Sequence, residues 1–106
     1  MSKRILVVDD SATMRDMLIQ YLQASDYMVA TATSGTQALE LLKTERYDII
    51  ITDLEMPELD GFGLIRAVSE LEWDPGLVLM TQHNERTLHS ARELALAYSV
   101  NLLGTL

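Results

Sequence analysis

The amino-acid sequence predicts an α/β domain built on a doubly wound, five-stranded parallel sheet with helices on both faces. Short apolar runs rich in Val, Ile and Leu alternate with amphipathic helical patterns over all 106 residues. The runs are continuously apolar, which is typical of strands covered on both faces. The connections are short, so each strand is expected to join the next through a right-handed crossover helix.

The first half of the chain predicts two strand–helix units. In order, these are a strand over residues 5–8, a helix over 14–22, an edge strand over 27–33 and a helix over 38–42. The first helix has one apolar stripe at spacing i, i+3, i+4, i+7 and i+8, whose members are Met14, Met17, Leu18, Tyr21 and Leu22. Ser11 precedes this stripe and is suited to cap the helix. Ser34 and Gly35 end the second, more polar strand.

The second half of the chain repeats the alternation. In order, it predicts a strand over residues 49–51, a helix over 64–71, a strand over 77–80, a helix over 88–98 and a strand beginning over 100–103. The three consecutive isoleucines at 49–51 are the strongest strand signal. Asp74, Pro75 and Gly76 predict a turn, and Asp60 with Gly61 predicts a turn that caps the third helix.

Composition limits the kinds of partner. Sixteen acidic against eight basic residues give a net charge of −8, which disfavours phosphate backbones and anionic lipids as direct partners. The chain has no cysteine, so it contains neither disulfides nor thiolate metal sites, which is compatible with a reducing cytoplasm. No apolar run approaches the roughly 20 residues that span a bilayer.

Polar side chains follow three predicted strands, at the edge where sheets of this type hold their sites. They are Asp9 and Asp10 after the first strand, Asp53 after the third and Thr81 after the fourth. Carboxylates meeting there repel one another unless a cation joins them, and hard oxygen ligands suit Mg²⁺. The Asp pair alone is equally compatible with helix capping. Asp53 favours a site, because a carboxylate closing an isoleucine run is costly to bury without a partner.

Three segments of the sequence carry a resemblance to a known family. ILVVDDS, DIIITDLEMPELDGFGLI and LVLMT resemble the receiver domains of bacterial response regulators, the CheY-like family. The resemblance covers nearly the whole chain, and the middle segment is highly specific. It implies a flavodoxin-like sheet with strand order 2-1-3-4-5 and a cytoplasmic two-component signalling role.

The resemblance also implies a role for each site residue. Asp53 would accept a phosphoryl group from a phosphohistidine of a sensor histidine kinase or phosphotransfer protein. Mg²⁺ would be held by Asp9, Asp10, Asp53 and the backbone carbonyl of Glu55. Thr81 would donate a hydrogen bond to a phosphoryl oxygen and transmit the change to an output domain. Such a receiver catalyses only its own phosphorylation and hydrolysis and is not a turnover enzyme.

Other positions after Asp53 bear on the site. Pro57 is expected to keep the preceding residue extended, out of helix. Gln82 stands where the family generally has Ala or Gly, and could crowd the approach to Asp53. His83 occupies a position that, with Glu55, tunes water attack on the phosphate in the family. A surface histidine without a role is the alternative.

The end of the chain departs from the family pattern. Receivers carry a Lys at the end of the fifth strand, whereas no Lys follows Lys43 here. We expect the Lys and the last helix to lie beyond Leu106, so that residues 1–106 are an incomplete receiver. Leu103 or Thr105 in place of the Lys is the alternative. The ending VNLLGTL resembles receivers joined to EAL-type cyclic-di-GMP phosphodiesterase domains, and any phosphodiesterase activity would lie in such a domain.

Without that last helix, one face of the sheet would be open. Alternate apolar side chains of residues 77–80 and 100–106 are then expected to face water, and monomers seldom tolerate a large patch of this kind. The sequence therefore predicts self-association through the uncovered sheet face.

Two other functions use the same residues. A pseudo-receiver would keep the fold as an interaction module without phosphorylation, and the missing Lys keeps this alternative open. A haloacid-dehalogenase-like phosphatase places a second acid two residues after its nucleophile, and Glu55 is a crude match to that pattern. That class also needs late acidic residues and a cap, for which the chain has no room.

Overall fold

The computed structural model describes residues 3–56, 59–81 and 85–105. Their elements, in chain order, are β1 (Arg4–Val8), α1 (Ala12–Ala24), β2 (Met28–Ala32), α2 (Gly35–Thr44), β3 (Ile49–Asp53), α3 (Gly61–Ser69), β4 (Gly76–Met80), α4 (Glu85–Ala97) and β5 (Leu102–Thr105). All strand pairs are parallel, and the order across the sheet is β2-β1-β3-β4-β5. The predicted topology is confirmed, including the edge position of β2. Pro57, Gln82 and His83 lie outside the described residues.

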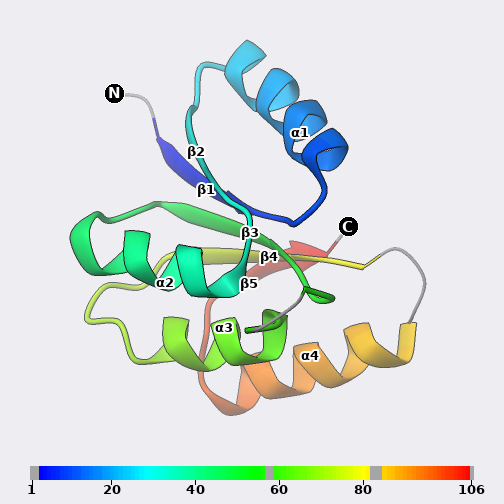
Figure 1. Cartoon of the computed structure of the whole chain (residues 1–106). Helices are drawn as coiled ribbons and strands as arrows, with labels where there is room; N and C mark the ends of the chain where they lie inside the picture. The colour runs from blue at the N-terminus through cyan, green and yellow to red at the C-terminus, as the bar shows by residue number, and fades with distance from the viewer. Residues whose placement is uncertain (1–2, 57–58, 82–84, 106) are drawn as a thin grey trace.

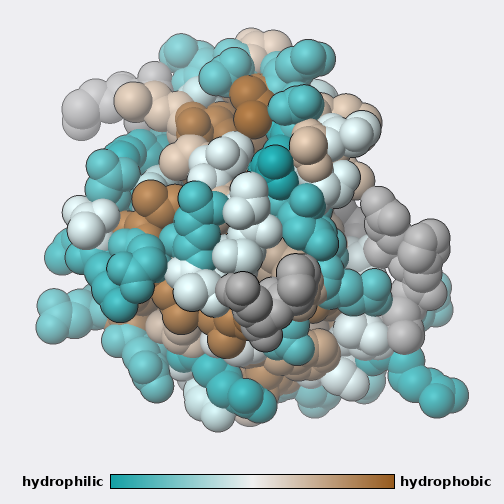
Figure 2. Space-filling view, in the orientation of Figure 1, coloured by the Kyte–Doolittle hydropathy of each residue, from teal (hydrophilic) through white to brown (hydrophobic). Residues whose placement is uncertain are grey.

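The described helices divide unequally between the two faces of the sheet (Figure 1). α1 lies alone on one face, whereas α2, α3 and α4 lie together on the other. Successive strand residues point to opposite faces, so Leu6, Ile50 and Leu79 join the larger core under the three helices. Ile5 and Ile51 face α1 and form a smaller core. Figure 2 shows a mainly hydrophilic surface in which apolar residues gather in separate patches.

The apolar stripe of α1 is only partly buried. Ser11 caps the helix as predicted, its Oγ accepting a hydrogen bond from the Met14 backbone N–H at 3.3 Å. Leu22 is buried, but Met17 is 59% exposed and Tyr21 74% exposed. The expectation that both face the core is wrong, because α1 packs on β1 and β2 and has no substantial contact with another described helix along its flank.

β5 begins two residues later than the sequence predicts. Ser99 takes the left-handed conformation at φ 58°, and its N–H donates to the Leu96 carbonyl at 3.1 Å. The Val100 N–H donates to the Ala95 carbonyl at 2.9 Å, and Val100 itself is buried. These contacts form a Schellman motif with its apolar contact. Val100 therefore belongs to the end of α4, and β5 starts at Leu102.

In the described residues of β4 and β5, the two faces of the sheet are covered to different extents. Leu77 and Leu79 are fully buried on the face of α2–α4, and Met80 is 8% exposed. Among the described residues of 77–80 and 100–105 that are apolar, Leu103 is more than half exposed, at 54%. On the opposite face, where alternate side chains were expected to be bare, Met80 is buried, Val78 is partly buried and Leu103 is exposed. The expectation is therefore confirmed for Leu103 and wrong for Met80, and self-association through this face stays a prediction. No helix in the described ranges is both long and apolar enough to cross a bilayer.

The contrast between Leu79 and Leu103 can be tested by truncation. We expect Leu79→Ala to lower the free energy of unfolding by about 2–5 kcal/mol, because it leaves a cavity in the larger core. Leu103→Ala is expected to cost less than about 1 kcal/mol, because much of its surface already meets water. Urea unfolding of both variants measures this difference in the free energy of unfolding. Equal losses in the two variants would show that Leu79 does not lie on the helix-covered face of the sheet.

Candidate metal centre

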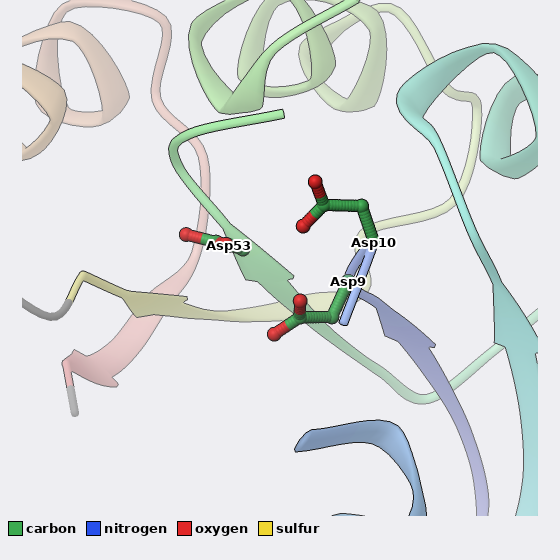
Figure 3. A group of neighbouring side chains, drawn as sticks. All are labelled: Asp9, Asp10 and Asp53. Carbon is green, nitrogen blue, oxygen red and sulfur yellow. The ribbon is translucent and has the colours of Figure 1, made fainter. Parts of the chain in front are cut away.

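Three aspartates meet at the carboxyl edge of the sheet. β1 and β3 are neighbours in register, with Val8 opposite Thr52, so the next residues Asp9 and Asp53 lie side by side. Asp10 follows from the same strand end as Asp9. One carboxylate oxygen from each aspartate lies within 4.8 Å of the others. Figure 3 shows the three side chains close together at the ends of the two strands. The predicted acidic cluster is confirmed as a geometric feature.

Asp9 is held by its own neighbourhood. Its N–H donates to the Ala32 carbonyl at 3.1 Å, and its Oδ1 accepts from the Ser11 N–H at 2.9 Å. The Arg15 guanidinium donates to the Asp9 backbone carbonyl at 2.7 Å. Asp9 is 4% exposed, so its carboxylate has little freedom to turn away from the cluster.

Asp53 is held by the loop that follows it. Its Oδ1 accepts from the Glu55 N–H at 3.1 Å. The Leu54 N–H donates to the Met80 carbonyl, also at 3.1 Å, and the Gly61 N–H closes the loop onto the Leu54 carbonyl at 3.2 Å. Leu54 is buried, so the backbone beyond Asp53 turns into the core and leaves the carboxylate at the sheet edge.

The electrostatics of the cluster favour a bound cation. Burial raises the pKa of Asp9, and the charge of Asp10 raises it further, against the opposing hydrogen bond from Ser11. Burial likewise raises the pKa of Asp53, and the charges of Asp9 and Asp10 add to this, against the Glu55 N–H hydrogen bond. Three oxygen donors that repel one another fit a hard divalent cation such as Mg²⁺, which relieves both the repulsion and the burial cost.

Thr81 completes the site from β4. Its Oγ1 is buried and has no hydrogen-bond partner among the described residues. With Asp9 and Asp53 it lines a cavity of about 280 Å³, whose other walls are Met14, Met17, Leu18 and Met80. A buried hydroxyl without a partner costs about 1–3 kcal/mol. This oxygen is therefore placed to receive a polar group that enters the cavity.

Glu55 and Arg15 show what sequence reasoning can and cannot find. The Glu55 side chain is exposed and its N–H holds Asp53, so the predicted metal role of its carbonyl stays a prediction. Arg15 was missed as a site residue. The sequence did contain a signal for it: a basic residue lies five positions after Asp10, near the start of the helix that follows Asp9 and Asp10.

Comparisons with known proteins identify the family. The family described as "Response regulator receiver domain" matches residues 5–99. The chain is 38% identical over 78 residues to the response regulator receiver protein CpdR of Brucella abortus, covering 74% of this chain and 63% of CpdR. The chain therefore belongs to the response regulator receiver domains, the signal-receiving class of two-component systems.

Solved structures of receivers share the fold. The chemotaxis response regulator CheY4 of Vibrio cholerae aligns with a TM-score of 0.83 and 28% identity, over 100% of this chain and 86% of CheY4. The response regulator TrrA of Thermotoga maritima, solved with Mg²⁺ and BeF, aligns with a TM-score of 0.80 and 30% identity, over 98% of this chain and 84% of TrrA. The chain spans 15–31% of the length of other curated relatives that it matches.

Neutralising Asp53 tests the electrostatic analysis. Because the folded state raises the pKa of Asp53, its ionised form costs stability above that pKa, and the cost disappears as pH falls below the ordinary value of 3.8. We expect Asp53→Asn to stabilise the metal-free protein at pH 7, by less than about 1 kcal/mol because solvent screens the half-buried group. The gain should shrink on acidification.

Urea unfolding of wild type and variant without divalent cations, from pH 7 to pH 4, measures this difference. The asparagine amide oxygen can still accept the hydrogen bond from the Glu55 N–H, so the two proteins differ in the charge at position 53 and keep this bond. A destabilised variant at pH 7 would contradict the prediction.

Proposed function

We propose that this receiver accepts a phosphoryl group on Asp53 from a phosphohistidine of a sensor histidine kinase or phosphotransfer protein, and signals to an output domain. The observation that carries the proposal is that Asp53 lies in a cluster of three carboxylates and lines one cavity with Asp9 and Thr81. The Thr81 hydroxyl has no hydrogen-bond partner among the described residues. A carboxylate nucleophile, a cation site and a free hydrogen-bond donor are the parts that phosphoryl transfer uses.

In the transfer step, an Asp53 carboxylate oxygen attacks phosphorus. The new P–O bond forms as the P–N bond to the partner's imidazole breaks, and the electron pair returns to the imidazole nitrogen. Water later attacks the same phosphorus, releasing phosphate and restoring the carboxylate. This is a self-catalysed cycle of a cytoplasmic switch, and no separate small-molecule substrate is turned over.

Asp9, Asp10, Asp53 and the Glu55 carbonyl would hold Mg²⁺ in this proposal. When bound, the ion supplies positive charge that offsets the oxygen charge of the transferring group. The protein's own contribution is placement: the Ser11 N–H fixes the Asp9 carboxylate and the Glu55 N–H fixes that of Asp53. Asp53 thereby presents its other oxygen for attack.

Thr81 would couple phosphorylation to the output. Its hydroxyl has no partner among the residues that the structure describes, so a phosphoryl oxygen on Asp53 would give it one. Met80 and Asp53 are paired in the β4–β3 register, so Thr81 follows directly beside the acceptor. A pseudo-receiver is the alternative function, and it differs in taking up no phosphoryl group at all.

Chemical phosphorylation tests the assignment of Asp53. We expect wild-type protein treated with acetyl phosphate and Mg²⁺ to gain about 80 Da, the mass of one phosphoryl group, in intact-mass spectrometry. Asp53→Asn should gain nothing, because the amide is not a nucleophile, while its fold is retained. Asp48→Asn is the matched control, since Asp48 lies before the same strand at its opposite end. Labelling of Asp53→Asn would refute the site.

Two variants should separate Mg²⁺ binding from the conformational response to phosphorylation. Asp10→Ala is expected to weaken Mg²⁺ binding about tenfold or more and to slow phosphorylation in proportion, because it removes a ligand. Thr81→Ala should leave Mg²⁺ affinity within about twofold but lose the backbone shifts that phosphorylation causes at the end of β4. Calorimetric titration and amide NMR distinguish them, and unchanged affinity in Asp10→Ala would place the metal elsewhere.

A further inference from the structure

A close main-chain contact joins the loop after Asp53 to a helix distant in sequence. Gly35, the first residue of α2, lies against Leu59, which precedes the α3 cap. A Cβ on Gly35 would overlap the Leu59 carbonyl oxygen and lie 2.9 Å from Leu59 Cβ. Real Cβ atoms do not approach backbone so closely, so any side chain at position 35 must displace the loop or the helix.

The loop in question is the one that orients the acceptor carboxylate. It leaves β3 at Asp53, whose Oδ1 accepts the Glu55 N–H, and closes through the hydrogen bond between Gly61 N–H and the Leu54 carbonyl. A Cβ on Gly61 would lie 2.7 Å from Leu54 Cα, so the base of the loop is tightly packed. A displacement at Leu59 would therefore reach Asp53 through Gly61 and Leu54, which are in contact.

The α2 side of the contact is the firmer of the two. Ser34 caps α2, its Oγ accepting the Gln37 N–H at 3.1 Å, and the Gln37 side chain accepts the Thr33 N–H in return at 2.6 Å. The arrangement is similar to a capping box, except that Gln37 bonds the N–H of the residue before the N-cap. Ala38 and Leu42 anchor the helix in the larger core, where they are 0% and 5% exposed. A methyl group at position 35 would therefore move the loop and leave the helix in place.

We propose that Gly35 is a positioning residue for the metal centre: the absence of a side chain lets the Leu59 main chain seat against α2, which holds the loop that orients Asp53 and Glu55. This inference rests on the proposed function, because it concerns the same carboxylate and carbonyl. Gly35 itself touches neither the cation nor the phosphoryl group.

A second glycine provides a matched control. A Cβ on Gly63 would also meet Leu59, but at the far end of its side chain, where it would overlap Cδ1 and lie 3.0 Å from Cγ. A leucine side chain can rotate, whereas a carbonyl oxygen cannot move without the backbone. Gly104 is a neutral control, since a Cβ there meets nothing within 4 Å.

The experiment compares Gly35→Ala, Gly63→Ala and Gly104→Ala in the chain as it stands. Calorimetric titration measures Mg²⁺ affinity, and urea unfolding measures stability in parallel. We expect Gly35→Ala to weaken Mg²⁺ binding about tenfold, as loss of a supporting contact does at metal sites, and the other two to stay within about twofold. Adding Leu59→Ala should not restore binding to Gly35→Ala, because the obstructing oxygen belongs to the backbone.

The outcomes separate this inference from the proposed function. Wild-type affinity in Gly35→Ala overturns the inference alone, and so does equal weakening in Gly63→Ala. Recovery of Mg²⁺ binding in the Gly35→Ala/Leu59→Ala double variant overturns it too, since the side chain would then be the obstacle. Failure of the wild type to bind Mg²⁺ overturns the proposed function and the inference together.

Hydrogen exchange on the wild type covers the case in which Gly35→Ala does not fold. Coupling is reciprocal, so Mg²⁺ should slow exchange several-fold at the first turn of α2, where the Gln37 and Ala38 N–H groups bond to Ser34. The Glu45 N–H at the other end of the helix, bonded to the Leu41 carbonyl, should not respond. Equal effects at both ends, or none at the first turn, would overturn the inference.

Discussion

β1 and β3 are neighbouring parallel strands, so Asp9, which follows β1, and Asp53, which ends β3, are held close together. Forty-three positions separate them in the chain, yet the parallel register brings both carboxylates to one edge together with Asp10. Burial and mutual repulsion raise the pKa values of Asp9 and Asp53, and main-chain N–H groups offset this only in part. The unrelieved charge is what favours a cation at this edge of the sheet.

The two sides of the cluster are held by different means. Asp9 is fixed by the strand pair, by the Ser11 N–H and by the Arg15 guanidinium on its carbonyl, all within the β1–α1 unit or its direct neighbour. Asp53 depends on a loop that must be supported from outside, and α2 supplies this support where Leu59 meets Gly35. If this contact positions the loop, as we propose, the Asp53 side of the cluster is the one that distant substitutions can disturb.

The sequence carries enough information for the sheet and for the acidic cluster, because both follow from local patterns. The continuous apolar run at 49–51 and the aspartates that end two strands need no knowledge of tertiary contacts. The start of β5 was predicted two residues too early. Ser99 takes a left-handed conformation that assigns Val100 to the end of the helix, and a serine, unlike a glycine, gives no sequence signal for that conformation. The exposure of Met17 was missed because amphipathic spacing cannot say whether a second helix lies alongside.

The two faces of the sheet are covered unequally, so β4 and the residue that follows it lie in different surroundings. Leu77 and Leu79 are fully buried on the face that carries three helices, so the body of β4 is anchored there. Thr81 lies beyond that anchor and borders a cavity on the other side, with methionine side chains among its walls. Methionine adapts its shape at low cost, so these walls can adjust to a group that enters the cavity. The Thr81 hydroxyl, which has no partner among the described residues, thus lies just beyond the buried part of the strand, where an entering polar group can reach it.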